Sequence, residues 1–393
     1  MRALRNVGRL LSLSEPVRER VDVLIRGDRV DSVVPAGTGS RYEEEFDCEG
    51  GLLTPGLIDA HTHPLYLRPR LGEISQRAAG ASYSEVAGAG GGINATVRET
   101  RLASWAELEA TVRSRFVDWL SQGTTTVEAK TGYWLDRDGE LGGVALLRRL
   151  ADEPDLPRLV PTYLAAHEIP DEYRADREGY VRAVQEWCPQ AATAGADFAD
   201  VFCDQGAFTV SESEAILLAA RAAGLKLRLH ADELGLTGGA QLAARLEAVS
   251  ADHLLQIGAA EIEALAAAGT VATLCPVTAM SMGRLPPARQ LLDRGVRIAL
   301  GTDHNPGTSG ATRMSLIVYL AITELHLSVA EAVEAATHGG AASLALVDRG
   351  SVRPGQLADL TLWKTDHEGA FAWDPGLEAR AVWKAGGLVA QGV

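Results

Sequence analysis

The chain has 393 residues, of which 37 are Lys or Arg and 52 are Asp or Glu, so its formal net charge is −15. Hydrophobic residues make up 46% of the sequence, which is enough to bury a large core and excludes an intrinsically disordered protein. The acidic balance argues against a nucleic-acid-binding surface, because such a surface needs clustered Lys and Arg.

Both ends of the chain contain short strand-like runs. Residues 21–34 hold two apolar runs around the turn dipeptide Gly27-Asp28 and predict a β-hairpin. Residues 358–387, near the C-terminus, also contain two strand-like apolar runs. Since neither end easily makes a stable sheet alone, we predict that residues 1–53 and 346–393 pair into one small composite β-sandwich domain.

Residues 54–345 alternate strand-like apolar runs with helical stretches. Three of these stretches open with a Ser-x-x-Glu capping box, at Ser104, Ser211 and Ser328. Eight such β/α units predict an α/β protein with a TIM-like (β/α)8 barrel. A doubly wound open sheet is the alternative, but the glycine-rich phosphate loop expected after its first strand is absent from the sequence. The predicted strands end in or near His63, Lys130, His167, Cys203, His230, His253, Cys275 and Asp303.

Three histidines and one aspartate lie at these strand ends. In a strand, alternate residues face the same side, so His61 and His63 point together. His230 ends the fifth run and Asp303 the eighth, and a barrel brings all strand ends to one face. His61, His63, His230 and Asp303 therefore predict a site for one divalent metal per chain, Zn or Fe. The alternative for the His-x-His pair by itself is two ordinary polar residues at a strand end.

A metal in such a site lowers the pKa of its water and polarises a carbonyl group. Acid/base side chains must then accept the water proton and protonate a leaving nitrogen. Asp303, Glu233 and His253 are the catalytic candidates, because each lies at or just after a strand end. We do not expect His304 to share the metal with Asp303, since adjacent strand residues face opposite ways.

Several longer motifs occur in order along the chain. They are Arg70-x-x-Glu73, Tyr83, Gly90-Gly91-Gly92, Lys130-Thr131-Gly132-Tyr133, Ala166-His167-Glu168-Ile169-Pro170, His230-Ala231-Asp232-Glu233, Ala251-Asp252-His253 and Asp303-His304-Asn305-Pro306-Gly307. As an ordered set over essentially the whole chain, they resemble the imidazolonepropionases of the amidohydrolase superfamily. This resemblance implies a metal-dependent hydrolase that opens the cyclic amide of 4-imidazolone-5-propanoate to give N-formimidoyl-L-glutamate, in histidine degradation.

The resemblance also implies roles for particular residues. Glu233 and His253 match an acid/base pair around the water and the substrate ring. Arg70 matches a substrate contact, although a solvated surface arginine is the alternative, because Arg68 stands nearby. The full set of implied substrate contacts is Arg70, Tyr83, Tyr133, His167, Asn305, Gly307 and Thr308. We read the Gly90–Gly92 run as a flexible loop near the barrel mouth.

The sequence departs from the family pattern at several positions. Trp134 stands where the family usually has glycine, and it is expected to narrow the pocket. Cys275-Pro276-Val277 replaces the usual Leu-Pro-Gly, and Met280 and Met282 follow it. These departures leave the metal chemistry intact, but Trp134 keeps open the alternative of another cyclic amidohydrolase or an aromatic deaminase of the same superfamily. A second alternative, from a different class, is a metal-free, non-catalytic relative; the presence of all four candidate ligands argues against it.

The remaining expectations concern the setting of the protein. No stretch approaches the ~20 uninterrupted apolar residues of a membrane span, and no signal-peptide pattern follows Met1. The four cysteines are widely spaced, which disfavours a disulfide framework. We therefore expect a cytoplasmic enzyme with a small-molecule substrate, without membrane or nucleic-acid partners, and assembled as a homodimer.

Overall fold

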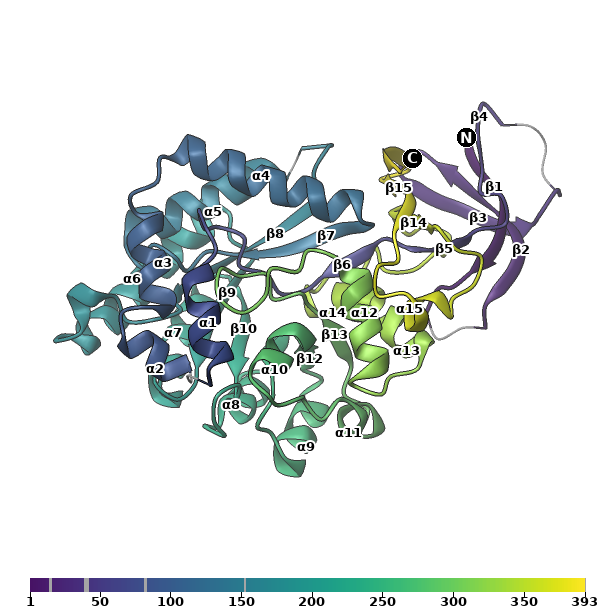
Figure 1. The fold of residues 1–393 in the computed structure, drawn as a ribbon. Helices are drawn as coiled ribbons and strands as arrows, with labels where there is room; N and C mark the ends of the chain where they lie inside the picture. Colours follow the sequence, from purple (N-terminus) through teal and green to yellow (C-terminus); the bar gives the residue numbers. More distant parts are fainter. Residues whose placement is uncertain (14–15, 39–41, 81–82, 152, 393) are drawn as a thin grey trace.

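Two sheets of eight strands each organise the chain. The computed structural model describes residues 1–13, 16–38, 42–80, 83–151 and 153–392. One sheet forms a barrel, and the other lies to one side of it (Figure 1).

Both ends of the chain contribute to the smaller domain. Its strands are β1 (Arg2–Leu10), β2 (Arg18–Arg26), β3 (Arg29–Pro35), β4 (Glu44–Asp47), β5 (Leu52–Pro55), β14 (Leu360–Trp363), β15 (Ala379–Lys384) and β16 (Gly387–Gln391). The antiparallel pairing of β5 with β14 joins the two ends, as predicted. Hydrogen bonds link all eight strands into one sheet, whereas a sandwich would have two.

This sheet curves around its own hydrophobic core. Val23 of β2, Leu53 of β5 and Trp383 of β15 belong to one buried cluster. Phe46 of β4 packs edge-on against Trp383, with ring centroids 4.9 Å apart, although the two strands are not paired. The domain limits 1–53, 54–345 and 346–393 stay a proposal; β5 itself continues to Pro55 before the barrel begins.

The barrel strands form a parallel sheet in sequence order. They are β6 (Leu57–Asp59), β7 (Thr124–Lys130), β8 (Arg158–Ala166), β9 (Phe198–Cys203), β10 (Lys226–Ala231), β11 (Ser250–His253), β12 (Val271–Leu274) and β13 (Ile298–Leu300). Beyond β6 and β13 the backbone closes the barrel: the Asp303 N–H donates to the His61 carbonyl at 3.0 Å, and Thr62 bridges to His304. All eight predicted runs therefore contain strands, and the TIM-like barrel is confirmed.

Helices alternate with these strands and surround the barrel (Figure 1). The α-helices are α1 (Ile74–Ala78), α2 (Tyr83–Gly88), α3 (Gly92–Thr100), α4 (Trp105–Ser121), α5 (Arg137–Ala151), α6 (Arg177–Ala194), α7 (Val210–Ala222), α8 (Gly239–Arg245), α9 (Ala259–Ala268), α10 (Pro276–Ser281), α11 (Ala288–Asp293), α12 (Met314–Thr323), α13 (Val329–Glu334), α14 (Gly340–Ser343) and α15 (Ala370–Trp373). Short 3-10 turns at Leu71–Glu73 and Asp171–Tyr173 and a π-turn at Ala335–Gly339 complete the set.

Helix capping follows the predicted pattern at two of three positions. Ser104 and Ser328 each form a capping box with the glutamate three residues later. The third prediction, at Ser211, is wrong: α7 begins earlier, and Thr209 caps it through Glu212. Glu212 also forms an ion pair with Arg177, the first residue of α6, at 2.6 Å. The residue that caps α7 therefore also links α7 to α6.

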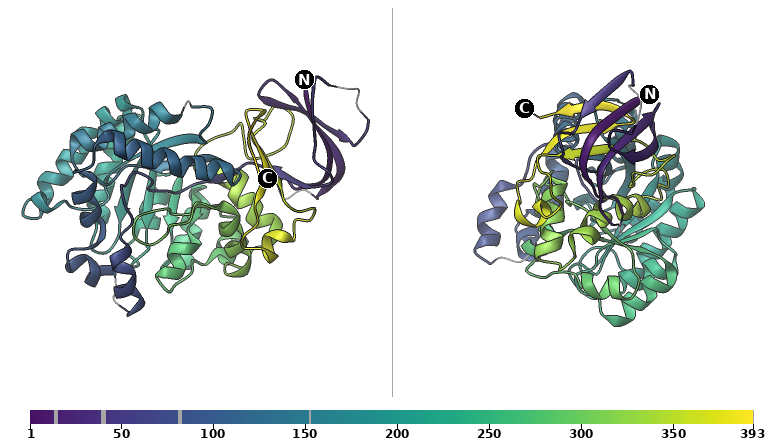
Figure 2. Two further views of the ribbon diagram at one scale, coloured as in Figure 1. Left: turned by 45° about the horizontal axis from the view of Figure 1, so that its top comes forward. Right: turned by 90° about the vertical axis from the view of Figure 1, so that its right-hand side faces the viewer.

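The two ends of the barrel have different surroundings. Since β5 leads directly into β6, the small domain lies toward the N-terminal ends of the barrel strands. Helices α1, α2 and α3 lie on the opposite side, at the carboxyl ends (Figures 1 and 2). Within the described ranges, no helix has both the length and the apolar composition that a membrane span requires.

Candidate active site

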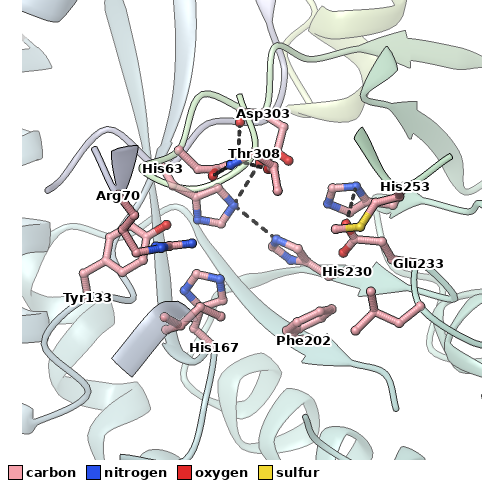
Figure 3. Close-up of a pocket in the computed structure, with 14 residues that line it drawn as sticks. His63, Arg70, Tyr133, His167, Phe202, His230, Glu233, His253, Asp303 and Thr308 are labelled. Atoms are coloured by element: carbon pink, nitrogen blue, oxygen red, sulfur yellow. Dashed lines mark hydrogen bonds and ion pairs between the residues drawn. The ribbon is translucent and has the colours of Figure 1, made fainter. Parts of the chain in front are cut away.

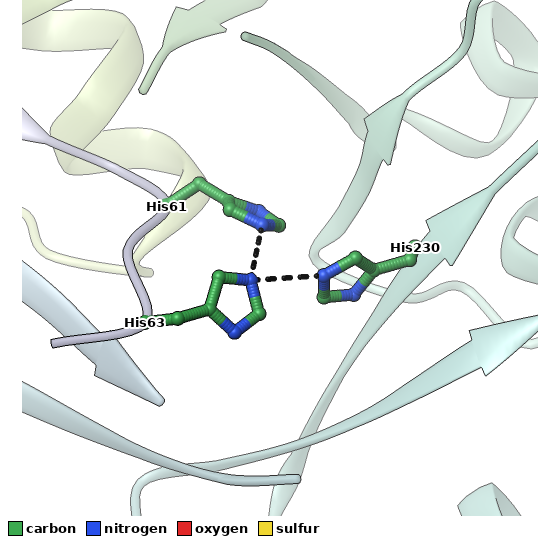
Figure 4. A group of neighbouring side chains, drawn as sticks. All are labelled: His61, His63 and His230. Carbon is green, nitrogen blue, oxygen red and sulfur yellow. Dashed lines mark hydrogen bonds between the residues drawn. The ribbon is translucent and has the colours of Figure 1, made fainter. Parts of the chain in front are cut away.

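Three imidazoles meet at the carboxyl ends of the barrel strands (Figure 4), and one carboxylate lies beside them. The Nε2 atom of His63 lies 3.2 Å from that of His61 and 3.2 Å from that of His230. Asp303 Oδ1 lies 3.4 Å from His63 Nε2 and 3.7 Å from His61 Nε2. All four side chains are buried. The structure therefore brings together the four residues predicted to bind a metal.

Buried carboxylates hold the outer nitrogens of two of these rings. His61 Nδ1 lies 2.6 Å from Asp252 Oδ2, and His230 Nδ1 lies 3.1 Å from Asp200 Oδ1. Because a carboxylate accepts, each Nδ1 carries the hydrogen and each Nε2 keeps its lone pair for a metal. Burial lowers the pKa of His61 and of His63 well below the usual range, which favours the neutral rings that bind metals. This donor set fits Zn²⁺ or Fe²⁺.

A buried charge network supports these carboxylates from behind. Lys130 Nζ lies 2.9 Å from Glu128 Oε1 and 2.8 Å from Asp200 Oδ2. Arg228 Nη2 donates to Asp252 Oδ2 at 2.9 Å. All five side chains are buried. These five residues were not predicted as site residues from the sequence, although a charged residue inside a strand that is buried on both faces indicates a buried partner of opposite charge.

Glu233 and His253 lie beside the cluster formed by His61, His63, His230 and Asp303. His253 Nδ1 is 3.7 Å from Glu233 Oε1, and the His253 ring centroid is 4.8 Å from that of His61. Burial, reinforced by the like charges of Asp303 and Asp204, raises the pKa of Glu233 well above its usual range. Burial lowers the pKa of His253. Among the described residues neither ring nitrogen of His253 has a hydrogen-bond partner, so both are available to a substrate or water.

The Asp303 carboxylate is oriented by a neighbouring hydroxyl. Thr278 Oγ1, in α10, donates to Asp303 Oδ2 at 2.5 Å and lies 3.2 Å from Thr308 Oγ1. Burial raises the pKa of Asp303 to about 6. The Asp303 backbone is left-handed, with φ +47°, as is that of His253, with φ +74°. Such backbones cost about 1–3 kcal/mol in non-glycine residues and concentrate at functional sites. Thr278 was not identified from the sequence.

A pocket opens over this cluster (Figure 3). The substrate-contact candidates Arg70, Tyr133 and His167 lie on one side of it, and Glu233 and His253 lie on the other. The complete lining consists of His63, Arg70, Ile93, Tyr133, His167, Phe202, His230, Glu233, Leu234, His253, Met282, Asp303, Asn305 and Thr308.

Arg70 is fixed in this pocket by two hydrogen bonds. Its Nε donates to Glu73 Oε2 at 3.0 Å and its Nη1 to Thr96 Oγ1 at 2.7 Å. The Arg70 side chain is 10% exposed and that of Arg68 is 77% exposed, so Arg68 is the solvated one. Glu73 Oε1 also accepts the Gly92 N–H at 2.8 Å, at the start of α3. The loop expected at Gly90–Gly92 therefore gives way to a helix at Gly92.

His167 presents one free nitrogen to the pocket. Its Nδ1 lies 3.0 Å from the Gly132 carbonyl, which can only accept, so Nδ1 donates and Nε2 remains an acceptor. The ring stacks on His63 with centroids 4.9 Å apart, and the Tyr133 ring lies 5.3 Å away. Burial lowers the pKa of His167 to about 3, so this residue is neutral near pH 7.

The loop after β13 is held together by one side chain. Asn305 Oδ1 accepts the N–H groups of Gly307 and Thr308, both at 2.8 Å, and Asn305 Nδ2 donates to the Asp303 carbonyl at 2.7 Å. Asn305 and Thr308 line the pocket, as expected. The two N–H groups already have a partner, so their direct contact with a substrate stays a prediction.

Comparison with known proteins identifies the family. A model of the amidohydrolase family matches residues 52–389. The imidazolonepropionase of Solibacter usitatus (strain Ellin6076) is 44% identical, over 88% of this chain and 84% of its own length. This chain belongs to the imidazolonepropionase family of amidohydrolases. The imidazolonepropionase of Myxococcus xanthus (strain DK1622) is 40% identical, over 98% of this chain and 96% of its own.

Solved structures share the fold of this imidazolonepropionase-family chain. A Xaa-Pro dipeptidase with bound methionine is 18% identical, with a TM-score of 0.73 over 100% of both chains. An N-isopropylammelide isopropylaminohydrolase from Burkholderia multivorans is 20% identical, with a TM-score of 0.72 over 99% of this chain and 98% of its own. At such identities the likeness concerns the fold alone.

The expected effect of Trp134 on the pocket was wrong. Trp134 does not narrow the pocket; it lies outside the lining and stacks on Trp105, with ring centroids 5.1 Å apart. Gly139 of α5 makes room for it, because a Cβ there would lie 2.3 Å from the Trp134 ring. Of the two methionines after β12, Met282 reaches the pocket and Met280 is exposed.

Two other positions complete the comparison with the predictions. His304 faces away from the metal cluster, as expected: its Nε2 lies 2.9 Å from the Tyr66 hydroxyl and its Nδ1 lies 3.1 Å from the Ala311 carbonyl. Tyr83 begins α2, but its side chain lies outside what the structure describes. Its predicted contact with the substrate stays a prediction.

Proposed function

We propose that this chain hydrolyses 4-imidazolone-5-propanoate to N-formimidoyl-L-glutamate, a step of histidine degradation. The observation that carries this proposal is the pocket that joins a three-histidine, one-aspartate cluster to the guanidinium of Arg70. Imidazolonepropionases at 44% and 40% identity support the same substrate. The reaction adds water to the lactam carbonyl carbon and breaks the adjacent C–N bond.

We propose that one divalent metal, Zn or Fe, is held by His61, His63, His230 and Asp303. Their distances and the carboxylates behind His61 and His230 support this assignment. When bound, such a metal supplies two effects, the activation of a water molecule and the polarisation of the lactam carbonyl.

The chain's own acid/base groups then move one proton. Asp303 accepts it from the attacking water, since its Oδ1 faces the histidine cluster while Thr278 holds its Oδ2. Glu233 and His253 lie 3.7 Å apart on the side of the pocket opposite Arg70, and they deliver a proton to the ring nitrogen as the C–N bond breaks. The raised pKa of Glu233 lets this carboxyl hold a proton near neutral pH.

Arg70, His167 and Tyr133 orient the substrate. Arg70 pairs with the propanoate, whose capture must overcome the repulsion of a chain with a net charge of −15. His167 Nε2 accepts a hydrogen bond from a ring N–H, and Tyr133 packs beside it. Further proposed contacts are Tyr83, Asn305, Gly307 and Thr308.

A spectroscopic turnover assay tests the substrate. Freshly generated imidazolone propanoate is compared with hydantoin, dihydroorotate and guanine. We expect turnover of the first at a kcat/KM at least about 100-fold above the others, a difference of ~2.7 kcal/mol. A preference for hydantoin or dihydroorotate would point to another cyclic amidohydrolase, and a preference for guanine would point to an aromatic deaminase.

Removal of the carboxylate anchor should weaken substrate capture. Arg70→Ala is expected to lower kcat/KM at least about tenfold, ~1.4 kcal/mol, because the guanidinium that pairs with the propanoate is lost. Arg68→Ala is the matched control, since that side chain is 77% exposed. Steady-state kinetics measure both variants. A wild-type value for Arg70→Ala would place the anchor elsewhere.

Gly307 leaves the space that Arg70 occupies. A Cβ at Gly307 would lie 1.9 Å from Arg70 Nη2. Gly307→Ala is therefore expected to displace the guanidinium and raise KM about fivefold or more, ~1 kcal/mol, with a smaller change in kcat. Gly310→Ala is the control on the same loop, because a Cβ at that position would meet nothing within 4 Å. Equal KM values for the two variants would contradict this role.

A homodimer and a cytoplasmic location also stay proposals for this chain.

A further inference from the structure

A second cavity lies at the end of the barrel opposite the active site. It has a volume of about 220 Å³. Arg158 and Lys226, the first residues of β8 and β10, line it, and Phe198, the first residue of the intervening β9, lies between those strands. Leu346 closes one side of it from the segment after α14. The catalytic side chains lie at the carboxyl ends of the same strands, so this cavity is a separate site.

The cavity concentrates positive charge in an acidic protein. Four cationic side chains line it, Arg148, Arg158, Lys226 and Arg349, with Asp197 as the acidic one. The chain as a whole has a net charge of −15, so cationic residues outnumber acidic ones in the lining of this cavity, whereas acidic residues outnumber cationic ones in the whole chain. Clefts lined by charge of one sign attract small ions of the opposite sign.

Two of these cations are already neutralised by neighbours. Arg148 Nη2 lies 2.6 Å from Asp197 Oδ2, and this guanidinium also donates to the Gly195 carbonyl. Arg349 Nε lies 3.0 Å from Asp348 Oδ1. Arg148 and Arg349 therefore line the cavity with their charges already paired to carboxylates.

The other two cations have unused donors. Within the described residues the Arg158 side chain donates no hydrogen bond: its Nε is buried without a partner, and the nearest carboxylate oxygen, of Asp359, is 3.7 Å away. The Arg158 side chain is only 33% exposed, so water cannot freely satisfy all its N–H groups. In the same described part of the chain, Lys226 Nζ has no ion pair and lies 5.4 Å from the centroid of the Phe198 ring.

We propose that this cavity binds a small dianion, a phosphate group or a dicarboxylate, between Arg158 and Lys226. Lys226 lies level with Phe198, which pairs with Thr162, so Arg158 lies four residues nearer the start of β8. Both long side chains nevertheless line the same cavity. A planar guanidinium binds two oxygens of a phosphate or carboxylate at once, and the ammonium adds a second charge.

The test uses the full chain and three anions at constant ionic strength: inorganic phosphate, glutarate and, as the monoanion, acetate. Thermal unfolding and isothermal titration calorimetry measure binding, because a ligand of the folded state raises its Tm. We expect a saturable rise in Tm with phosphate or glutarate but not with acetate, and the better of the two dianions identifies the ligand class.

Variants then place the site. Arg158→Gln and Lys226→Gln should each raise the Kd at least about tenfold, a change of ~1.4 kcal/mol. Arg182→Gln, at an exposed position outside the cavity, should leave the Kd within about twofold of the wild-type value. Arg70→Ala should also leave it unchanged, because Arg70 belongs to the catalytic pocket. Lys226 is exposed, so its variant remains informative if Arg158→Gln does not fold.

Three results would overturn the proposal. The first is a Tm shift that acetate reproduces, which reflects ionic strength alone. The second is binding that Arg158→Gln and Lys226→Gln both retain. The third is binding that Arg70→Ala abolishes, which would assign the anion to the catalytic pocket.

Discussion

Replacing His63 with alanine is expected to leave less than a tenth of an equivalent of metal per chain and to lower kcat/KM at least about 1000-fold, ~4 kcal/mol. The reason is its central place in the cluster: His63 Nε2 lies 3.2 Å from the Nε2 atoms of both His61 and His230 and 3.4 Å from Asp303 Oδ1. Elemental analysis of the purified protein measures the metal, and we expect about one equivalent of Zn or Fe in the wild type.

Two controls accompany this prediction. His367→Ala removes an imidazole on the surface and should keep both metal and activity. Dialysis of the wild type against a chelator should abolish turnover, and re-addition of Zn or Fe(II) shows which ion restores it. Full activity in chelator with less than a tenth of an equivalent of metal would refute a metal mechanism and favour a different use of the cluster.

The second large effect is expected from the charge network behind the metal cluster. Lys130→Met should lower the free energy of unfolding by about 3–5 kcal/mol, because it leaves Glu128 and Asp200 buried without their cation. Since Asp200 also orients His230, the affinity for metal should fall about 10–100-fold. Denaturant unfolding of the metal-free chain measures the first effect, and competition with a chromophoric chelator measures the second.

A lysine in an exposed ion pair provides the matched control. Lys364 Nζ lies 3.0 Å from Glu378 Oε2, and both side chains are more than a third exposed, at 37% and 55%. Lys364→Met should therefore change the stability by about 0–1 kcal/mol, as is usual for such pairs. If Lys130→Met were no less stable than Lys364→Met and bound metal normally, the network would have no supporting role.

Much of the barrel followed from the sequence, because the pattern that defines it is local. Apolar runs of strand length alternate with helical stretches, and each of the eight runs contains a strand. Strand ends were less predictable: β6 stops at Asp59 and β13 at Leu300, before the predicted ligands. His61 and Asp303 instead lie just beyond these strands, and the Asp303 N–H donates to the His61 carbonyl, a hydrogen bond between residues far apart in the chain.

The candidate site likewise contains residues whose positions were predictable from the sequence and residues whose positions were not. The meeting of His61, His63, His230 and Asp303 was predictable, because a barrel brings the carboxyl ends of its strands to one face. Their binding of a metal stays a prediction. The burial of Arg70 and its bond to Glu73 also agreed with the Arg-x-x-Glu spacing. Trp134 was misread, since its direction depends on the space left by Gly139 and on stacking with Trp105, neither of which a sequence pattern records.

By itself, the sequence determined the barrel, the pairing of the two chain ends and the residue types that reach the catalytic face, because hydrophobic period and strand-end position are local properties. Only the tertiary structure decided which buried charges pair behind the histidine cluster and which cationic side chains at the far end of the barrel keep N–H groups without a hydrogen-bond acceptor. The physical reason is that a buried charge is stabilised by partners on neighbouring strands: Lys130 depends on Asp200, and Arg228 on Asp252, across gaps that no local pattern spans.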